Sequence, residues 1–359
     1  MDRDQPPSPR PLPVFYQAVR ARLKDILPIL LALVGGFVIG GLIILAAGHN
    51  PFTTYFALLN GAVGDQYNLA STLGRAIPIM GCGIAAAIAF KAGLFNIGIE
   101  GQLVLGGLAG TVVALYFPPG PLAILLALLA ALIAGGSWAL LAGWFETQFN
   151  VPILISTLMM NYIAVGFTSY MISFPLIEPG GSRNQTPTLP EATRFAKLIP
   201  GSSIHIGIIL IILAVILAAF IMYRTVSGYE LRMFGANRQF AISGGIRPTR
   251  MVLAVMLCSG MVAGLTGAIQ VLGVHYRLID TALTLPSYAW TGVMAAILSN
   301  NNPIGVVIAS LFFSAIQTGA AGMERATEVP FQLSYVVQAL MIILIAVRAT
   351  LKITFKRER

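Results

Sequence analysis

The chain contains repeated runs of about 20 residues without a charge, and these runs limit its fold more than any other feature. A helix needs about this length to cross the hydrocarbon core of a membrane. Helices and closed barrels are the structures that satisfy their own backbone there, and these runs are too long for barrel strands. Charged residues make up only 10% of the 359 residues. We therefore predict an all-α membrane protein, a polytopic bundle of about ten transmembrane helices.

The predicted membrane spans can be read directly from the apolar runs. Seven runs are clear: Ile26–Gly48, Leu69–Phe90, Leu94–Phe117, Pro121–Phe145, Pro152–Phe174, Ile204–Tyr223 and Met251–Gly273. The run from Thr281 to Met323 is long enough for two passes, with a turn at Asn300–Pro303. Gln332–Val347 is the last. These runs define a transmembrane domain over 26–348, between a proline-rich basic arm (1–25) and a basic tail (349–359).

The positive residues indicate how the chain is oriented. The net charge of +9 could indicate nucleic-acid binding, but the charges fall between the spans, so we expect no nucleic-acid partner. With both termini in the cytoplasm, sixteen of the 22 Lys and Arg residues lie on that side. This bias obeys the positive-inside rule and an even number of crossings. We expect a multi-pass protein of the bacterial inner membrane with cytoplasmic termini.

Glycine is abundant within the spans, in pairs such as Gly35–Gly36, Gly106–Gly107 and Gly135–Gly136. Small residues let helices approach closely in lipid, where no hydrophobic force drives them together. A bundle of ten helices could also divide into two inverted halves of five, as in many transporters, although no residue-level repeat supports this.

The sequence lacks the patterns of an enzyme or a metal site. No GxxxxGK phosphate-binding loop is present, so any ATP would be used by another subunit. Cys82 and Cys258 lie in apolar runs without a CxxC pair. No HExxH or GxSxG motif occurs. We expect no catalytic residues, no metal and no cofactor bound by this chain.

One polar segment interrupts the apolar pattern, FNIGIEGQ at 95–102. Its Asn96, Glu100 and Gln102 would be costly against lipid, so they must face protein or water. Asn96 and Glu100 are four residues apart and are predicted to share a helix face, with Gln102 pointing elsewhere. Two interpretations stay open: a discontinuous helix that lines a substrate pathway, or a polar network that joins neighbouring helices. The same alternatives hold for Asn161 in the fifth run.

The loop at 224–250 is basic, with five arginines, and it is the most informative segment between the predicted spans. Asn237 is a suitable N-cap for a short helix over Arg238–Ser243, and Gly244–Gly245 supplies a left-handed C-cap. Leu231, Phe234 and Phe240 offer apolar anchors on a basic loop. The loop is therefore either a helix presented to a cytoplasmic partner or a solvated positive loop.

Several of these segments resemble a known family, the permease subunits of ATP-binding-cassette importers in the branched-chain amino acid, ribose and nucleoside group. FNIGIEGQ, STLMMNYIA (156–164) and WTGVMAAILSNNNPIG (290–305) are similar to its nucleoside and simple-sugar branch. The 224–250 loop resembles the group's coupling loop, which contacts the ATPase. The residues that carry this likeness are Gly228, Leu231, Arg232, Gly235, Asn237, Ala241, Gly244 and Ile246.

The resemblance implies a function and a set of partners. It implies a permease subunit of an ATP-driven importer for nucleosides, or alternatively for a simple sugar such as ribose. Asn96, Glu100, Gln102, Asn161 and Trp290 are the residues expected along the substrate pathway. The expected partners are an ATPase subunit, a second permease and an extracytoplasmic binding lipoprotein. An ion-coupled secondary transporter is the competing function, and it would favour acids at mid-membrane, where only Glu100 qualifies.

Overall fold

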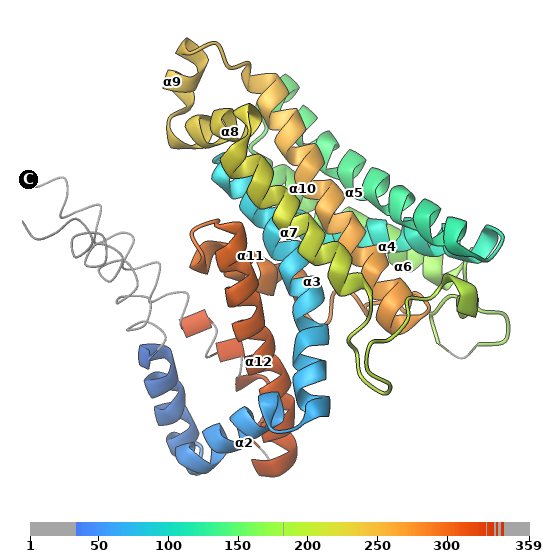
Figure 1. The fold of residues 1–359 in the computed structure, drawn as a ribbon, viewed down its shortest axis with the longest axis vertical. Coiled ribbons are helices and arrows are strands. Elements are labelled where there is room, and N and C mark those ends of the chain that lie inside the picture. Colours follow the sequence, from blue (N-terminus) through green and yellow to red (C-terminus); the bar gives the residue numbers. More distant parts are fainter. Residues whose placement is uncertain (1–33, 182, 328, 334, 337–338, 341–359) are drawn as a thin grey trace, which may run out of the picture. The chain divides into compact units, whose positions relative to one another are not determined.

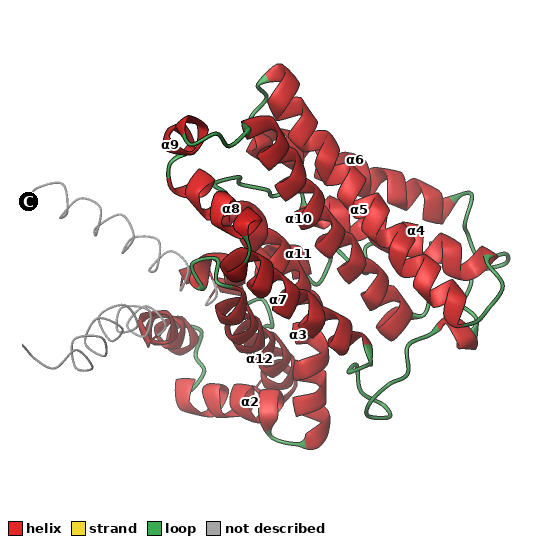
Figure 2. Ribbon diagram, turned by 45° about the horizontal axis from the view of Figure 1, so that its top comes forward, coloured by secondary structure: helices red, strands yellow, loops and turns green. Residues whose placement is uncertain are grey.

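The computed structural model describes residues 34–181, 183–327, 329–333, 335–336 and 339–340. These residues fall into two compact units, the first made of residues 34–54 with the described residues after 328, and the second of the described residues in 55–328. In the second unit, seven described helices are long and apolar enough to cross a membrane. An eighth span is possible if the helical segment 34–46 and α2 (Pro51–Val63) form one broken crossing. Figure 2 shows helices and loops and no strand among the described residues.

The prediction of an all-α membrane protein is confirmed, and most spans lie where the sequence placed them. The spanning helices are α3 (Gln66–Lys91), α4 (Ile99–Tyr116), α5 (Pro121–Phe149), α6 (Ile153–Ser173), α7 (Gly207–Arg224), α10 (Pro248–Gln270) and α12 (Pro303–Thr327). Proline occupies the first position of α2, α5, α10 and α12, where its missing N–H has no partner to lose.

Three elements differ from the predictions. Helices α2 and α8 (Val226–Ala236) were not expected, because neither is long or apolar enough to stand out as a span. The predicted hairpin of two spans turns at Asn300–Asn302, as expected, but α11 (Tyr288–Leu298) is too short to cross by itself. The count of about ten helices is not confirmed. The arm, the tail, most of the run after Gln332 and the start of the first run lie outside the described residues, and the charge bias depends on the arm and tail.

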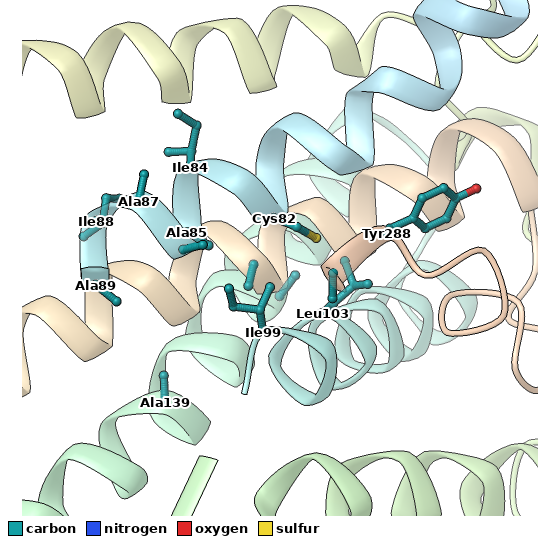
Figure 3. Packing of buried hydrophobic residues seen from close by; sticks show 14 of the residues in the cluster. Cys82, Ile84, Ala85, Ala87, Ile88, Ala89, Ile99, Leu103, Ala139 and Tyr288 are labelled. Carbon is teal, nitrogen blue, oxygen red and sulfur yellow. The ribbon is translucent and has the colours of Figure 1, made fainter. Parts of the chain in front are cut away.

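Helices α3 and α10 form the centre of the second unit. Helix α10 packs against α3, α4 and α5, and α3 packs in addition against α11 and α12. In α3, 83% of the most apolar 18-residue stretch is buried, against 28% in α5 and α7. Figure 3 shows Cys82 of α3 beside Ile99 and Leu103 of α4 in this core. The peripheral α5 and α7 therefore leave the largest apolar surface for lipid.

Glycine allows the backbones of α4, α5 and α10 to approach one another at a single level. Gly264 of α10 lies against Gly106 of α4 and against Ala131 and Gly135 of α5. A Cβ at Gly264 would overlap the carbonyl oxygen of Ala131, a backbone atom that cannot turn away. Gly106 and Gly135 stand out in the sequence as members of glycine pairs, but their shared contact with Gly264 is visible only in the structure.

The long segment between α6 and α7 folds back along the segment that follows α10. Antiparallel backbone contacts join Gln185 to Ile279, and the Thr186 N–H donates to the carbonyl of Leu278 over 2.9 Å. Arg277 pairs with Glu178 over 2.9 Å. Next to α7, burial and the nearby Lys197 lower the pKa of His205 to about 4, so the ring is neutral at neutral pH. This segment lies at the end of the bundle opposite α8 and α9 (Arg238–Ser243) (Figure 1).

The glycine crossing gives a first prediction. Replacing Gly264 by Ala should lower the thermal unfolding temperature of the detergent-purified protein, because α5 and α10 must separate to admit the methyl group; we expect a loss of about 1–3 kcal/mol. The matched control is Gly166→Ala on α6, where a Cβ meets nothing within 4 Å. Equal unfolding temperatures for the two variants would contradict the role of the crossing.

Candidate functional site

The polar segment before α4 is held in place by amide side chains. Asn96 is fully buried, and its Oδ1 accepts hydrogen bonds from Gly98 N at 2.9 Å and from Gln102 Nε2 at 3.2 Å. Its Nδ2 donates to Ser259 Oγ of α10 at 3.0 Å, and Ser259 in turn donates to Ala85 O of α3 at 2.7 Å. The segment is thus joined to α3, α4 and α10 by one continuous network.

Asn161 makes the corresponding connection from α6. Its Oδ1 accepts from Gly101 N at 2.8 Å, and its Nδ2 donates to Ile97 O at 2.9 Å. Thr157, one turn earlier on α6, accepts from Ile97 N at 3.3 Å. Asn161 is 5% exposed. Both hydrogen-bonding ends of this amide are therefore occupied by the backbone around the start of α4.

The structure corrects the predicted geometry of this segment. Helix α4 begins at Ile99, so Asn96 precedes the helix and does not share a face with Glu100. Asn96 instead bonds Gln102, which had been expected to point elsewhere. Sequence reasoning also missed Ser259, because a single serine beside Gly260 in an apolar run is ordinary. The side-chain amides of Asn96, Gln102 and Asn161 already form hydrogen bonds within the protein, which join neighbouring helices.

Glu100 and Trp290 form a second group. Glu100 is half-buried near the start of α4, within hydrogen-bonding reach of the Trp290 side chain on α11 and close to Cys82 of α3. Trp290 is 40% exposed. Of the five residues predicted for the pathway, these two keep exposed surface, and the fold brings them together from distant parts of the chain.

The predicted coupling loop contains a docked helix, α8. Thr225 caps it by accepting from Gly228 N at 3.1 Å. Leu231 and Phe234 are 7% and 3% exposed, so they anchor α8 on its own chain and are not available to a partner, contrary to the expectation. The guanidinium of Arg232 lies over the Tyr223 ring at 5.4 Å. Gly235 packs directly on the carbonyl of Lys91, which ties α8 to the turn that leads into the Asn96 segment.

The short helix α9 has the predicted bounds, Arg238–Ser243. Asn237 caps it through a 3.0 Å hydrogen bond from Phe240 N, as expected. The left-handed residue is Gly245 (φ 91°) rather than Gly244, which has φ −78°. Ala241, within α9, and Ile246, just after it, are both buried.

Two side chains of α9, Phe240 and Arg238, lie on its outer surface. Phe240 is 64% exposed, so it is the apolar anchor that remains available to a partner. Arg238 pairs with Glu146 at the end of α5 over 3.3 Å. Helix α9 is therefore held by the burial of Ala241 and by the Arg238–Glu146 ion pair, and it presents one aromatic side chain outward.

No three His, Cys, Asp or Glu side chains of the described residues lie close enough to hold a metal ion. The two places offer one carboxylate and one indole near the start of α4, and one exposed aromatic side chain on α9.

Known proteins resemble this chain over most of its length. The guanosine ABC transporter permease protein NupP of Bacillus subtilis is 34% identical over 90% of this chain and 94% of its own. The glucose ABC transporter permease protein TsgB13 of Haloferax volcanii is 32% identical over 87% and 85% of the two chains. The nucleoside ABC transporter permease protein NupB of Lactococcus lactis is 30% identical over 94% and 95%. No solved structure matches the chain.

A family model gives the same assignment independently of any single relative. The model described as branched-chain amino acid transport system, permease component, matches residues 68–346, which include every spanning helix from α3 to α12 except the first two residues of α3. The chain therefore belongs to this permease family and is a membrane-spanning permease subunit of an ABC transporter.

Proposed function

We propose that this permease carries nucleosides into the cell, driven by a separate ATPase subunit. The observation that carries the proposal is the similarity over about nine-tenths of the chain to two permeases named for guanosine and for nucleosides. A simple sugar is the second candidate, because a relative named for glucose is 32% identical. An ion-coupled carrier has less support: among the described spanning helices, Glu146 and Glu324 lie in the last turns of α5 and α12, and only Glu100 lies beside the polar Asn96 segment.

The proposed assembly follows from what the family requires. A permease of this family works with an ATPase and a substrate-binding protein. For this chain we propose a second permease subunit and a binding lipoprotein as well, in the inner membrane of a bacterium. The end of the bundle with α8 and α9 would face the cytoplasm, and the Arg277–Glu178 end would face outward.

We assign different roles to the five predicted pathway residues. Glu100 and Trp290 would line the pathway, because both retain exposed surface near the start of α4. Asn96, Gln102 and Asn161 would hold that wall in shape, because their amides bond the backbone and one another.

Coupling would run through α8 and α9. Phe240 would insert into the ATPase, and movement of α9 would pass through α8 to Lys91 by the direct backbone packing at Gly235. Lys91 ends α3 and is followed by the turn to Asn96, so the same contact reaches the pathway wall. A rigid docked helix can transmit such movement, whereas a solvated loop would absorb it.

The nucleoside proposal is tested by uptake in vesicles that contain the permease with its ATPase, second permease and binding protein. We expect ATP-dependent uptake of radiolabelled guanosine that is reduced by excess unlabelled uridine or adenosine but not by glucose or ribose. Uptake that survives ATP depletion and collapses with a protonophore would mean an ion-coupled carrier. Competition by a sugar alone would assign the chain to sugars.

The two groups of polar residues should respond differently to mutation. Glu100→Gln should reduce guanosine uptake about tenfold with little change in unfolding temperature, because the side chain keeps its size and is not part of the buried network. Asn96→Ala should lower the free energy of unfolding by about 1–3 kcal/mol, because it removes the donor to Ser259 Oγ and leaves Gly98 N without its acceptor. Normal uptake by Glu100→Gln at equal protein level would remove Glu100 from the pathway.

Coupling is tested on Phe240, because Gly235 is closely packed and a substitution there would disturb folding. Phe240→Ala should abolish stimulation of ATP hydrolysis by substrate and reduce uptake at least tenfold, with an unchanged unfolding temperature. Phe174→Ala is the matched control, since Phe174 is 66% exposed at the far end of α6. If both variants keep fully stimulated hydrolysis, α9 does not contact the ATPase.

A further inference from the structure

A separate polar pocket opens at the end of the bundle where α3 begins and α12 ends. Its volume is about 300 Å³, and its walls come from α3, α11, α12 and the end of α10. Its polar lining includes Arg75, Gln270, Tyr288, Thr318 and Arg325. None of the pathway residues predicted from the sequence lines it.

The pocket contains buried polar atoms without partners. Gln270 is 2% exposed, and its Nε2 donates to the Tyr288 hydroxyl at 3.4 Å. Its Oε1 has no hydrogen-bond partner among the described residues, and neither has Oγ1 of Thr318. Buried polar groups of this kind are rarely left unpaired, since burial without a partner is unfavourable. The Gln270 carbonyl is therefore able to accept a hydrogen bond from a molecule in the pocket.

The backbone beside Gln270 is irregular. Residues Val271–His275 form a π-helical turn directly after α10, and Gln270 and Val274 both line the pocket. Such turns are rare and occur frequently at functional sites. Tyr276, Thr281 and Ser287, between this turn and α11, have positive φ angles of 55°, 64° and 55°. Unfavourable backbone angles in residues other than glycine tend to gather where a ligand is held.

The charge of the pocket limits what it can hold. Arg75 and Arg325 line it, and no Asp or Glu among the described residues does. Arg75 makes one long hydrogen bond, 3.4 Å from Nη1 to Gln317 Oε1, and Arg325 Nε donates to Ala321 O at 3.0 Å. Each guanidinium has five N–H donors, so both retain capacity for a ligand. A fitting ligand carries several acceptors for the arginines and at least one N–H or O–H for Gln270.

We propose that this pocket is a nucleoside-binding site, where the substrate first contacts the permease after leaving the binding protein. A nucleoside offers ring nitrogens and carbonyls to Arg75, a ribose or base donor to Gln270 Oε1, and a flat face to the rings of Tyr67 and Tyr288. A volume of about 300 Å³ is within the range of small-molecule sites. The proposal rests on the proposed function and adds a binding site to it.

The test uses protection of a cysteine placed in the pocket, measured on the purified permease–ATPase complex. Ser71, which lines the pocket, is changed to Cys in a chain that also carries Cys258→Ser; Cys82 is fully buried and stays in place. We expect guanosine to slow labelling of Ser71→Cys by a maleimide, and Gln270→Leu to raise the half-protecting guanosine concentration about three- to tenfold. The reference is Cys258 in the native chain, which lines a different cavity beside Arg247 and Arg250 and should not be protected.

The possible outcomes separate the pocket from the transport function. Arg75→Gln should weaken protection like Gln270→Leu, whereas Arg183→Gln, an exposed charge outside the pocket, should leave it unchanged. Uptake of guanosine by the wild-type complex with no protection at Ser71→Cys overturns the pocket alone. Better protection by guanosine monophosphate than by guanosine also overturns it, because an anion site would then explain the arginines. Absence of uptake by the wild-type complex refutes the proposed function itself.

Discussion

The contact between α10 and its neighbours at Gly264 sets the distances on which the rest of the bundle depends. In lipid, apolar side chains gain little from meeting one another, so helices associate through close van der Waals packing and internal hydrogen bonds. Gly106, Gly135 and Gly264 provide that packing by removing the side chains at the point of closest approach. The short distance brings Ser259 of α10, little more than one turn away, within 3.0 Å of Asn96. The polar network around α4 therefore exists because the glycines allow the helices to approach.

That network separates polar residues which look equivalent in the sequence. An amide has two donors and two acceptor sites, and Asn96 uses both ends of its side chain within the protein. Glu100 lies only four residues later, yet it is only partly buried, beside Trp290 of α11. In the proposed pathway, such a wall would be rigid where its amides are hydrogen-bonded within the protein, and accessible to substrate at the carboxylate and the indole. Rigid support for a few accessible side chains is typical of binding sites.

The proposed coupling element, α8 and α9, likewise depends on packing against the rest of the bundle. Helices α8 and α9 are too short to be stable alone in water, so their conformation depends on docking. The two helices pack against the rest of the chain through buried side chains, whereas Phe240 stays exposed. The buried residues are Leu231, Phe234, Ala241 and Ile246. The backbone packing of Gly235 on Lys91 then connects this element to α3 without any intervening side chain. In the proposed coupling, movement at Phe240 would reach the segment that carries Asn96 through this contact.

Much of the fold could be predicted from local sequence. Apolar runs, proline at helix starts and the Asn237 cap depend on neighbouring residues, so the spans from α3 to α7 and the bounds of α9 were correctly placed. The short helices α2 and α8 were missed, because an apolar run of 20 residues is needed to recognise a span. The start of α4 was also misplaced, since its capping partners lie on α6 and α10.

The sequence by itself determined that this chain is a membrane-spanning helical protein, because only helices can bury such long uncharged runs in lipid. The tertiary structure decided which polar side chains form hydrogen bonds within the protein and which keep exposed surface. Asn96 meets Ser259 across 163 residues of chain, and Gln270 meets Tyr288 only because the π-helical turn and the segment after it bring them together. Hydrogen-bond partners of this kind are set by how helices cross, and the crossing depends on packing between distant segments that no local pattern records.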